Sequence, residues 1–473
     1  AISAINTSHK LTVRYELGRQ SADDTRDELV LAILRNVGKS DRVGCDWLRR
    51  QVEDLRSGSF DSVGWARALQ LHRTELDRAV RPEMDRVLML RLMRSLATKA
   101  ADLGLVEEAV LLAQEHLDLV PPTNRDLIDT ATWAVENELD PLVTRLQSMH
   151  SRLFRKDALL VYITAEVAMS RGDIEESESL AKSALAINPI PPEGERDGLS
   201  EIELERRGFQ HNTVGNGLRK RGYARWAERE FKFVMDSMPI DSRVAAGARY
   251  QLASMRSDLF DHDGVIEVLA PLIERLKIDK EAQKKLSNVC RHEELQGLSD
   301  FHLGHREWKK GNVQQAIEGF ESAYKNGPQQ RVDALIAMYR IQGGGETFEA
   351  SVRQRIEKMT LDFDRNVQRA ASEYRRMGNS DDNGAYASAL NDYAWLVANT
   401  FGLYDRALQC SEKSLEIFED EPTFLDTLAR CHFALGNMEE AIKFQRRAVE
   451  LEPHQPPLLR QLKEFENAQA ATP

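Results

Sequence analysis

One stretch of the sequence concentrates basic side chains that could bind an anion. Residues 211–231 read HNTVGNGLRKRGYARWAEREF, and residues 206–227 contain six Lys and Arg but no Asp or Glu. Glycines beside cations can form a phosphate-binding loop. However, Gly215, Gly217 and Gly222 fit neither the G-x-G-x-x-G nor the G-x-x-x-x-G-K-[ST] spacing. We therefore predict no nucleotide site in this stretch.

A second stretch, CRHEELQGLSDFHLGHREW at residues 290–308, contains side chains of types that bind zinc. These are Cys290, His292, His302 and His305. Their C-x-H…H-x-x-H spacing is not an established zinc signature, and two histidines on one helix can simply face its neighbours. We predict no metal site, although the question stays open for these four residues.

Catalytic motifs are not found in the sequence. It has no G-x-S-x-G nucleophile elbow, no H-E-x-x-H pair and no kinase or P-loop set. We therefore expect no catalytic residues, no cofactor and a non-enzymatic role. The four cysteines, Cys45, Cys290, Cys410 and Cys431, are too few and too scattered for a disulfide framework.

Composition limits the class of protein and of partner. A chain of 473 residues exceeds one ordinary hydrophobic core, so several domains or a repeat array are expected. The net charge of −12 argues against bulk electrostatic binding to nucleic acid or anionic lipid. No stretch holds the roughly 18 apolar residues that a membrane-spanning helix needs. The sequence begins without Met, as a removed signal peptide, a removed anchor or the mode of expression would explain, so the compartment stays open.

An internal repeat organises most of the chain. Gly436 is followed by Ala441 and then Pro453, and Gly402 and Ala407 lie 34 residues earlier at the same spacing. Four more stretches carry the same kind of pattern, listed here by their glycine, alanine, phenylalanine and proline: Gly104, Ala109 and Pro121; Gly172, Ala181 and Pro189; Gly222, Ala227, Phe231 and Pro239; Gly311, Ala316, Phe320 and Pro328. Small residues at such places let helices approach closely, and glycine ends a helix in a left-handed turn.

This pattern resembles the tetratricopeptide repeat family, whose units are pairs of antiparallel helices of 34 residues. The resemblance implies an all-α solenoid, a right-handed superhelix with a concave groove. Nine units are expected, starting near residues 90, 124, 158, 208, 246, 297, 331, 388 and 422. The predicted organisation is an N-terminal extension or cap at 1–89, units at 90–190, 208–279, 297–364 and 388–455, insertions at 191–207, 280–296 and 365–387, and a capping helix and tail at 456–473.

The resemblance also implies a set of partner-binding residues. Family positions that line the groove correspond to Asn212, Asn216, Arg219 and Lys220. Asparagines and cations there are similar to the clamp with which some family members hold a peptide carboxylate. A solvated basic face, paired with neighbouring acidic helices, is the alternative.

His305 and Trp308 are expected near the same concave side of a later unit. An aromatic residue there could anchor a peptide, or could pack against the next helix.

The leading functional hypothesis is a scaffold or adaptor that binds partner proteins or extended peptides, acidic ones among them, in the groove. One alternative is an accessory or regulatory subunit of an envelope-associated assembly, suggested by the start without Met. The other is a nucleic-acid binder that uses residues 206–229, which the acidic net charge disfavours. No small-molecule substrate is indicated.

Overall fold

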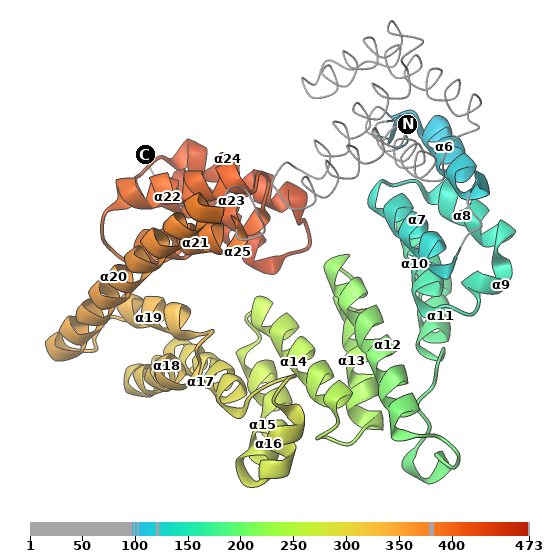
Figure 1. Ribbon diagram of the computed structural model, residues 1–473, viewed down its shortest axis with the longest axis horizontal. Coiled ribbons are helices and arrows are strands. Elements are labelled where there is room, and N and C mark those ends of the chain that lie inside the picture. The colour runs from blue at the N-terminus through green and yellow to red at the C-terminus, as the bar shows by residue number, and fades with distance from the viewer. Residues whose placement is uncertain (1–96, 98–99, 102–103, 120–122, 378–382, 472–473) are drawn as a thin grey trace, which may run out of the picture. The chain divides into compact units, whose positions relative to one another are not determined.

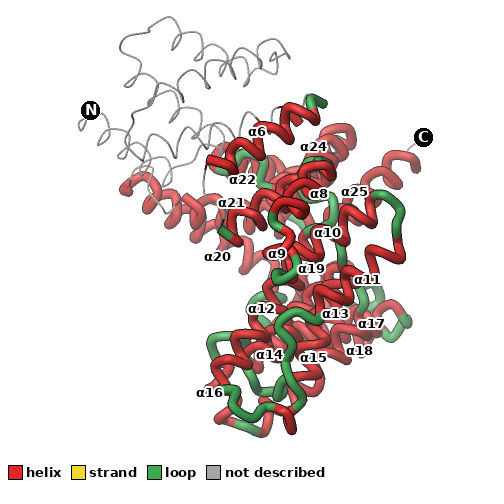
Figure 2. The backbone as a smooth tube through the Cα atoms, turned by 90° about the vertical axis from the view of Figure 1, so that its right-hand side faces the viewer, coloured by secondary structure: helices red, strands yellow, loops and turns green. Residues whose placement is uncertain are grey.

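Helices make up all regular structure in the part of the chain that the computed structural model describes, which is residues 97, 100–101, 104–119, 123–377 and 383–471 (Figures 1 and 2). The predicted N-terminal extension, residues 1–89, and Cys45 lie outside the described residues. The chain divides into two compact units, Ala1–Ile187 and Asn188–Pro473, called unit 1 and unit 2 below. The architecture is the expected all-α solenoid of stacked helix pairs.

Unit 1 contains six described helices. They are α6 (Val106–Leu119), α7 (Asn124–Glu136), α8 (Asp140–Met149), α9 (Ser151–Phe154), α10 (Ala158–Ser170) and α11 (Ile174–Leu185). Its core gathers around α10, where Leu160 and Ile163 are fully buried among side chains from α6 to α9. Side chains of Thr123 and Asp157 cap the N-termini of α7 and α10, because each accepts hydrogen bonds from the first backbone amides.

Unit 2 contains the remaining helices. They are α12 (Glu201–Lys220), α13 (Ala224–Ser237), α14 (Arg243–Asp258), α15 (His262–Ile278), α16 (Lys280–Leu286), α17 (His292–Lys309), α18 (Val313–Asn326), α19 (Arg331–Arg340), α20 (Glu346–Met377), α21 (Asn383–Asn399), α22 (Tyr404–Ile417), α23 (Pro422–Ala434), α24 (Met438–Leu451) and α25 (Pro456–Ala471). Figure 1 shows that the pairs follow one another along a curved path from α12 to α25. Among the described residues, no helix combines the length and the apolar character needed to cross a membrane.

The turn inside a helix pair repeats one geometry. Gly172, Gly222, Gly311 and Gly436 have φ values between 81° and 87°, a left-handed conformation that costs glycine little. In each case the glycine N–H donates to the carbonyl three residues back, and the next N–H donates to the carbonyl five residues back. This is the Schellman arrangement, which satisfies the last carbonyls of the first helix.

Small residues allow the two helices of a pair to pack closely. A Cβ atom at Gly215 would lie 2.7 Å from the Phe231 ring, and one at Gly304 would lie 2.7 Å from the Phe320 ring. Both phenylalanines are fully buried. The close packing expected from the repeat pattern is therefore present in α12–α13 and in α17–α18.

Segments that the sequence places between units carry helical structure as well. Residues 191–207 include the 3-10 helix Glu193–Glu195 and the start of α12. Residues 280–296 include α16 and the start of α17, and residues 365–387 include the end of α20 and the start of α21. Helix α20 continues past residue 364, where the sequence predicts the end of a unit, because neither glycine nor proline interrupts the helix. Its buried Ile356 and Val367 join two successive core clusters.

Candidate protein-binding surfaces of unit 2

The basic stretch lies on α12, and much of its charge is bound within unit 2. The guanidinium of Arg219 pairs with the carboxylate of Asp258 and donates to the hydroxyl of Ser254, at 3.2 Å, both on α14. Arg206 and Arg207 both bind Glu203, one turn earlier on α12. Because these cations already have carboxylate partners, the stretch presents less free charge than its sequence indicates.

The two predicted asparagines and Lys220 have different environments. The side-chain amide of Asn212 donates to the backbone carbonyl of Val244 at 2.9 Å, which joins α12 to α14. Asn216 is half-buried, whereas Lys220 is exposed at the end of α12. Of the four predicted residues, Asn212 and Arg219 therefore bind α14, the first helix of the next pair. Their role toward a partner stays a prediction.

Sequence reasoning missed a buried ion pair beside this stretch. His211 Nδ1 lies 2.5 Å from a carboxylate oxygen of Glu230, and its Nε2 lies 3.2 Å from the carbonyl oxygen of Asn188. Both side chains are almost completely buried. These two contacts hold the ring between α13 and the segment that precedes α12. The sequence signal that could have indicated this contact is a histidine at a core position of α12, followed 19 residues later by an acidic residue.

His305 and Trp308 belong to an aromatic cluster between α15 and α17. The rings of His305 and His262 stack with centroids 5.2 Å apart, and His305 meets Phe320 edge-on at 4.9 Å. Trp308 also meets Phe320 edge-on, at 6.2 Å. Both predicted residues are half-buried, so they pack within the chain and also retain some exposed surface.

Burial controls the ionisation of this cluster. It lowers the pKa of His302 to about 3 and of His305 to about 4, with His262 as a second cause in each case. Nδ1 of His262 lies 2.8 Å from Nδ1 of His302, so one ring must donate and the other must accept. The neutral forms therefore dominate near neutral pH.

The four residues considered for zinc do not come together. His292 is the first residue of α17, Cys290 lies two residues before it, and His302 lies ten residues further along the helix. At about 1.5 Å per residue, the helix separates them by roughly 15 Å. Among the residues that the structure describes, no group of three His, Cys, Asp or Glu side chains is arranged to hold a metal ion.

A further polar surface connects four alternate helices of unit 2, α19, α21, α23 and α25. Trp395 Nε1 donates to Asp333 at 3.5 Å, Arg340 donates to Asn399 at 2.6 Å, and Arg430 donates to Glu464 at 2.7 Å. These contacts join α19 to α21 and α23 to α25. Arg340 also interacts electrostatically with Arg430 and Glu464. We call this surface the inner face: Asp333, Arg340, Asp392, Trp395, Asn399, Arg430 and Glu464.

Charged groups on the inner face are accessible to solvent and yet closely surrounded by protein. Asp333, Arg340 and Asp392 are exposed by surface area. Burial nevertheless raises the pKa of both carboxyls and lowers that of Arg340. The two findings are compatible, because neighbouring atoms can displace part of the water around a charge without covering it.

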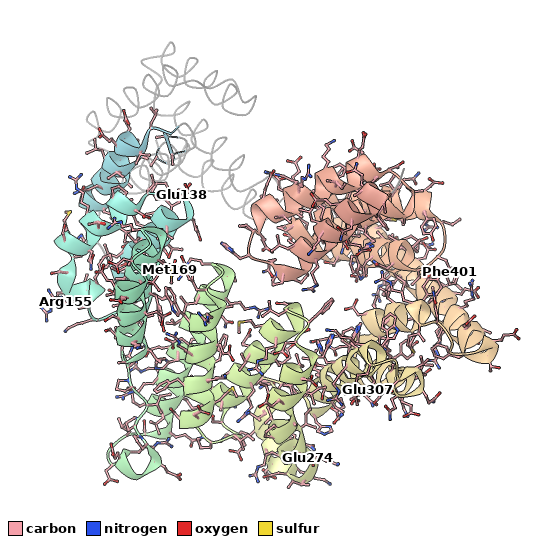
Figure 3. All side chains as sticks on the ribbon, turned by 180° about the vertical axis from the view of Figure 1, so that it is seen from behind. Glu138, Arg155, Met169, Glu274, Glu307 and Phe401 are labelled. Atoms are coloured by element: carbon pink, nitrogen blue, oxygen red, sulfur yellow. The ribbon has the colours of Figure 1, made fainter. Side chains whose placement is uncertain are left out.

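Aromatic residues support the inner face at the end of α21. Phe401, labelled in Figure 3, lies 5.7 Å from Tyr339 of α19, measured between ring centroids. The guanidinium of Arg353, on α20, lies over the Phe401 ring at 5.3 Å. These contacts fix α19, α20 and α21 relative to one another, and with them the positions of Asp333 and Arg340.

Comparisons with known proteins agree with this architecture. The family model described as tetratricopeptide repeat matches residues 423–455, which include nearly all of the α23–α24 pair. No curated protein matches the sequence.

Solved structures give distant likenesses. Yeast Tom70 is 11% identical, with 91% of this chain and 96% of that chain covered and a TM-score of 0.31. A Rap protein complexed with Competence and Sporulation Factor is 14% identical, with 79% and 99% covered and a TM-score of 0.33. The family model therefore shows one tetratricopeptide repeat, at residues 423–455, and three other helix pairs share the glycine turn of that repeat.

Proposed function

We propose that this chain is a non-enzymatic scaffold that binds an extended segment of a partner protein along the inner face of unit 2. The observation that carries the proposal is the state of Asp392 on α21. Its carboxylate is exposed, its pKa is raised, and burial is the one cause of that shift. A donor from a partner could bind this carboxylate in place of water.

The inner face offers both kinds of recognition group. Asp333 and Asp392 can accept hydrogen bonds, and the Arg340 guanidinium can donate to a backbone carbonyl or a carboxylate. Trp395 and Asn399 lie three and seven residues after Asp392, on the same side of α21. An extended peptide has donors and acceptors along its whole length, so it can pair with several of these groups.

The end of α12 supports a second contact, with an acidic part of the same segment. Lys220 is exposed there, and Asn216 lies one turn before it. Nucleic-acid binding by this stretch is the weaker proposal, because Arg206, Arg207 and Arg219 are bound to carboxylates of unit 2.

Affinity purification with the full chain tests the proposal. Proteins captured from native extract by the wild-type chain should be reduced at least tenfold with Asp392→Lys or Arg340→Ala. Lys325→Glu, on the exposed side of α18, is the matched control and should capture the same proteins as wild type. Equal capture by all four chains, each with unchanged helical content, would place the binding surface elsewhere.

A further inference from the structure

The turn between α14 and α15 departs from the repeat at one residue. Phe260 has a φ of 56° and occupies the place that Gly222 and Gly311 hold in the neighbouring pairs. Its backbone makes the same bonds: Phe260 N–H donates to Ser257, and Asp261 N–H donates to Arg256. Among described residues with positive φ, it is the one with a large apolar side chain. Such a residue is a steric outlier there, so some contact must favour it.

The Phe260 ring stacks on the rings of His262 and His305, at 5.6 Å and 6.1 Å between centroids, and a further contact comes from the far end of unit 2. The guanidinium carbon of Arg460, on α25, lies 3.7 Å from the centroid of the Phe260 ring. Arg460 also donates a hydrogen bond to the backbone carbonyl of Asp258, 202 residues earlier in the chain. A guanidinium over an aromatic face is attracted by the ring's quadrupole, and the carbonyl fixes its direction. Arg219 binds the carboxylate of the same Asp258 and so supports the carbonyl's position.

The turn of the preceding pair, α12–α13, contacts the same C-terminal segment. A Cβ atom at Gly222 would lie 2.6 Å from the ring of His454, in the connection between α24 and α25. Nothing lies within 4 Å of such an atom at Gly172, Gly311 or Gly436. Two consecutive turns, at Gly222 and Phe260, therefore contact one segment, residues 454–460.

We propose that the turns at Gly222 and Phe260 form a docking site for an arginine-bearing segment, and that α25 fills this site in the free chain. The aromatic ring and the Asp258 carbonyl recognise the guanidinium, and the missing side chain at Gly222 admits the ring of His454. When α25 is docked, the C-terminal end of unit 2 is in contact with two turns near its N-terminal end, at Gly222 and Phe260. Because Glu464 of the inner face lies on α25, this docking also positions one end of the inner face, a consequence that rests on the proposed function.

Hydrogen–deuterium exchange of the full chain without any partner tests the docking directly. The amides of Phe260 and Asp261 are hydrogen-bonded within the turn and report its opening. Arg460→Ala should raise their exchange rates at least fivefold. Lys463→Ala removes an exposed cation on α25, three residues after Arg460, and should leave the rates at wild-type values. Equal rates in the two variants would overturn the proposal.

A peptide added in trans separates a docking site from simple packing. A synthetic peptide of residues 453–471, at saturating concentration, should restore slow exchange to the Arg460→Ala chain. The same peptide carrying Arg460→Ala should not restore it. If neither peptide restores protection, or both do, guanidinium recognition at Phe260 is wrong.

Phe260→Gly supplies a readout that a packing role would not give. Glycine suits the left-handed turn, so the variant should keep the wild-type thermal unfolding midpoint and yet expose residues 458–471 to faster exchange. A lowered midpoint with unchanged exchange of α25 would show that Phe260 acts through local packing alone. Because no partner is present, these outcomes leave the inner-face proposal untouched, and failure of inner-face binding would leave the docking of α25 standing.

Discussion

The helix pairs α14–α15 and α17–α18 are neighbours in unit 2 and differ in how closely they follow the repeat. The α17–α18 pair has Gly304, Gly311, Ala316 and Phe320 at the diagnostic places, whereas α14–α15 has Ala253, Phe260, Val265 and Leu269. In both pairs the positions that face the core are fully buried. They are Ala316 and Phe320 in α17–α18, and Val265 and Leu269 in α14–α15. The pairs differ in their turns. A Cβ atom at Gly311 would have no neighbour within 4 Å, whereas the ring of Phe260 contacts the guanidinium of Arg460.

This difference separates two kinds of departure from the repeat. Leu269 in place of phenylalanine still fills the groove between helices, so it changes the packing without adding a contact. Phe260 in place of glycine puts a large side chain into an unfavourable backbone conformation, and the compensating contact lies 200 residues away in sequence. A departure that costs conformational energy therefore marks a place where another element binds.

The largest expected effect concerns the shared core. Phe320→Ala should lower the free energy of unfolding by about 3–5 kcal/mol, and Leu269→Ala by about 2–5 kcal/mol, because each leaves a cavity at a fully buried site. Urea unfolding followed by circular dichroism measures both. A loss below about 1 kcal/mol for Leu269→Ala alone would show that α14–α15 is not packed like its neighbour.

Acid should weaken the interface between these two pairs. Burial lowers the pKa of His302 to about 3 and of His305 to about 4, whereas histidine in the unfolded chain titrates near 6.5. The unfolded chain therefore binds protons that the folded chain does not, and stability falls as pH drops below about 6.5. The slope is at most about 1.4 kcal/mol per pH unit for each histidine.

His305→Phe keeps a ring against Phe301 and Phe320 but removes one titrating group. The loss of stability between pH 6.5 and pH 5 should be smaller in this variant by about 1 kcal/mol per pH unit. Urea midpoints at the two pH values measure it. An unchanged slope would mean that His305 is protonated in the folded chain.

Exchanging the turn residues tests the backbone side of the comparison. Gly311→Phe should cost about 1–2 kcal/mol, because it imposes the left-handed conformation on phenylalanine with no cation at that turn to offset it. Thermal unfolding of this variant beside wild type gives the difference. A stable Gly311→Phe chain would show that Phe260 needs no compensating contact.

The smallest effect on stability is expected at the end of α12. Lys220→Glu changes an exposed residue and should alter the free energy of unfolding by less than about 0.5 kcal/mol. Arg219→Glu should cost more, since it places a carboxylate against Asp258. If Lys220 contacts an acidic partner segment, its variant should weaken partner capture without changing the unfolding curve. Unchanged capture would remove Lys220 from the contact surface.

The fold could be predicted because its determinants are local in the sequence. Glycine at the turn and alanine and phenylalanine on the second helix recur at fixed spacing, and each acts on its own helix pair. The same register predicts that Asn212 and Arg219 line the groove. It did not show that they bind Val244 and Asp258, because a partner within the chain and a partner outside it require the same side chains.

The remaining features depend on contacts between distant segments. The inner face brings together residues of α19, α21, α23 and α25, and no spacing within one repeat indicates that Arg340 meets Asn399. Phe260 could be recognised from the sequence as the wrong residue for its turn, but its contact with Arg460 depends on the curvature of the whole of unit 2. Curvature accumulates over many small packing angles, so one sequence does not reveal it.

Selection of peptides from a random displayed library against the full chain tests inner-face recognition most directly. The dissociation constants of enriched peptides should rise at least tenfold with Asp392→Ala or Arg340→Ala and stay unchanged with Lys325→Ala. Failure to enrich any peptide, or equal affinity for all four chains, would contradict the claim that the inner face of unit 2 binds extended segments of partner proteins.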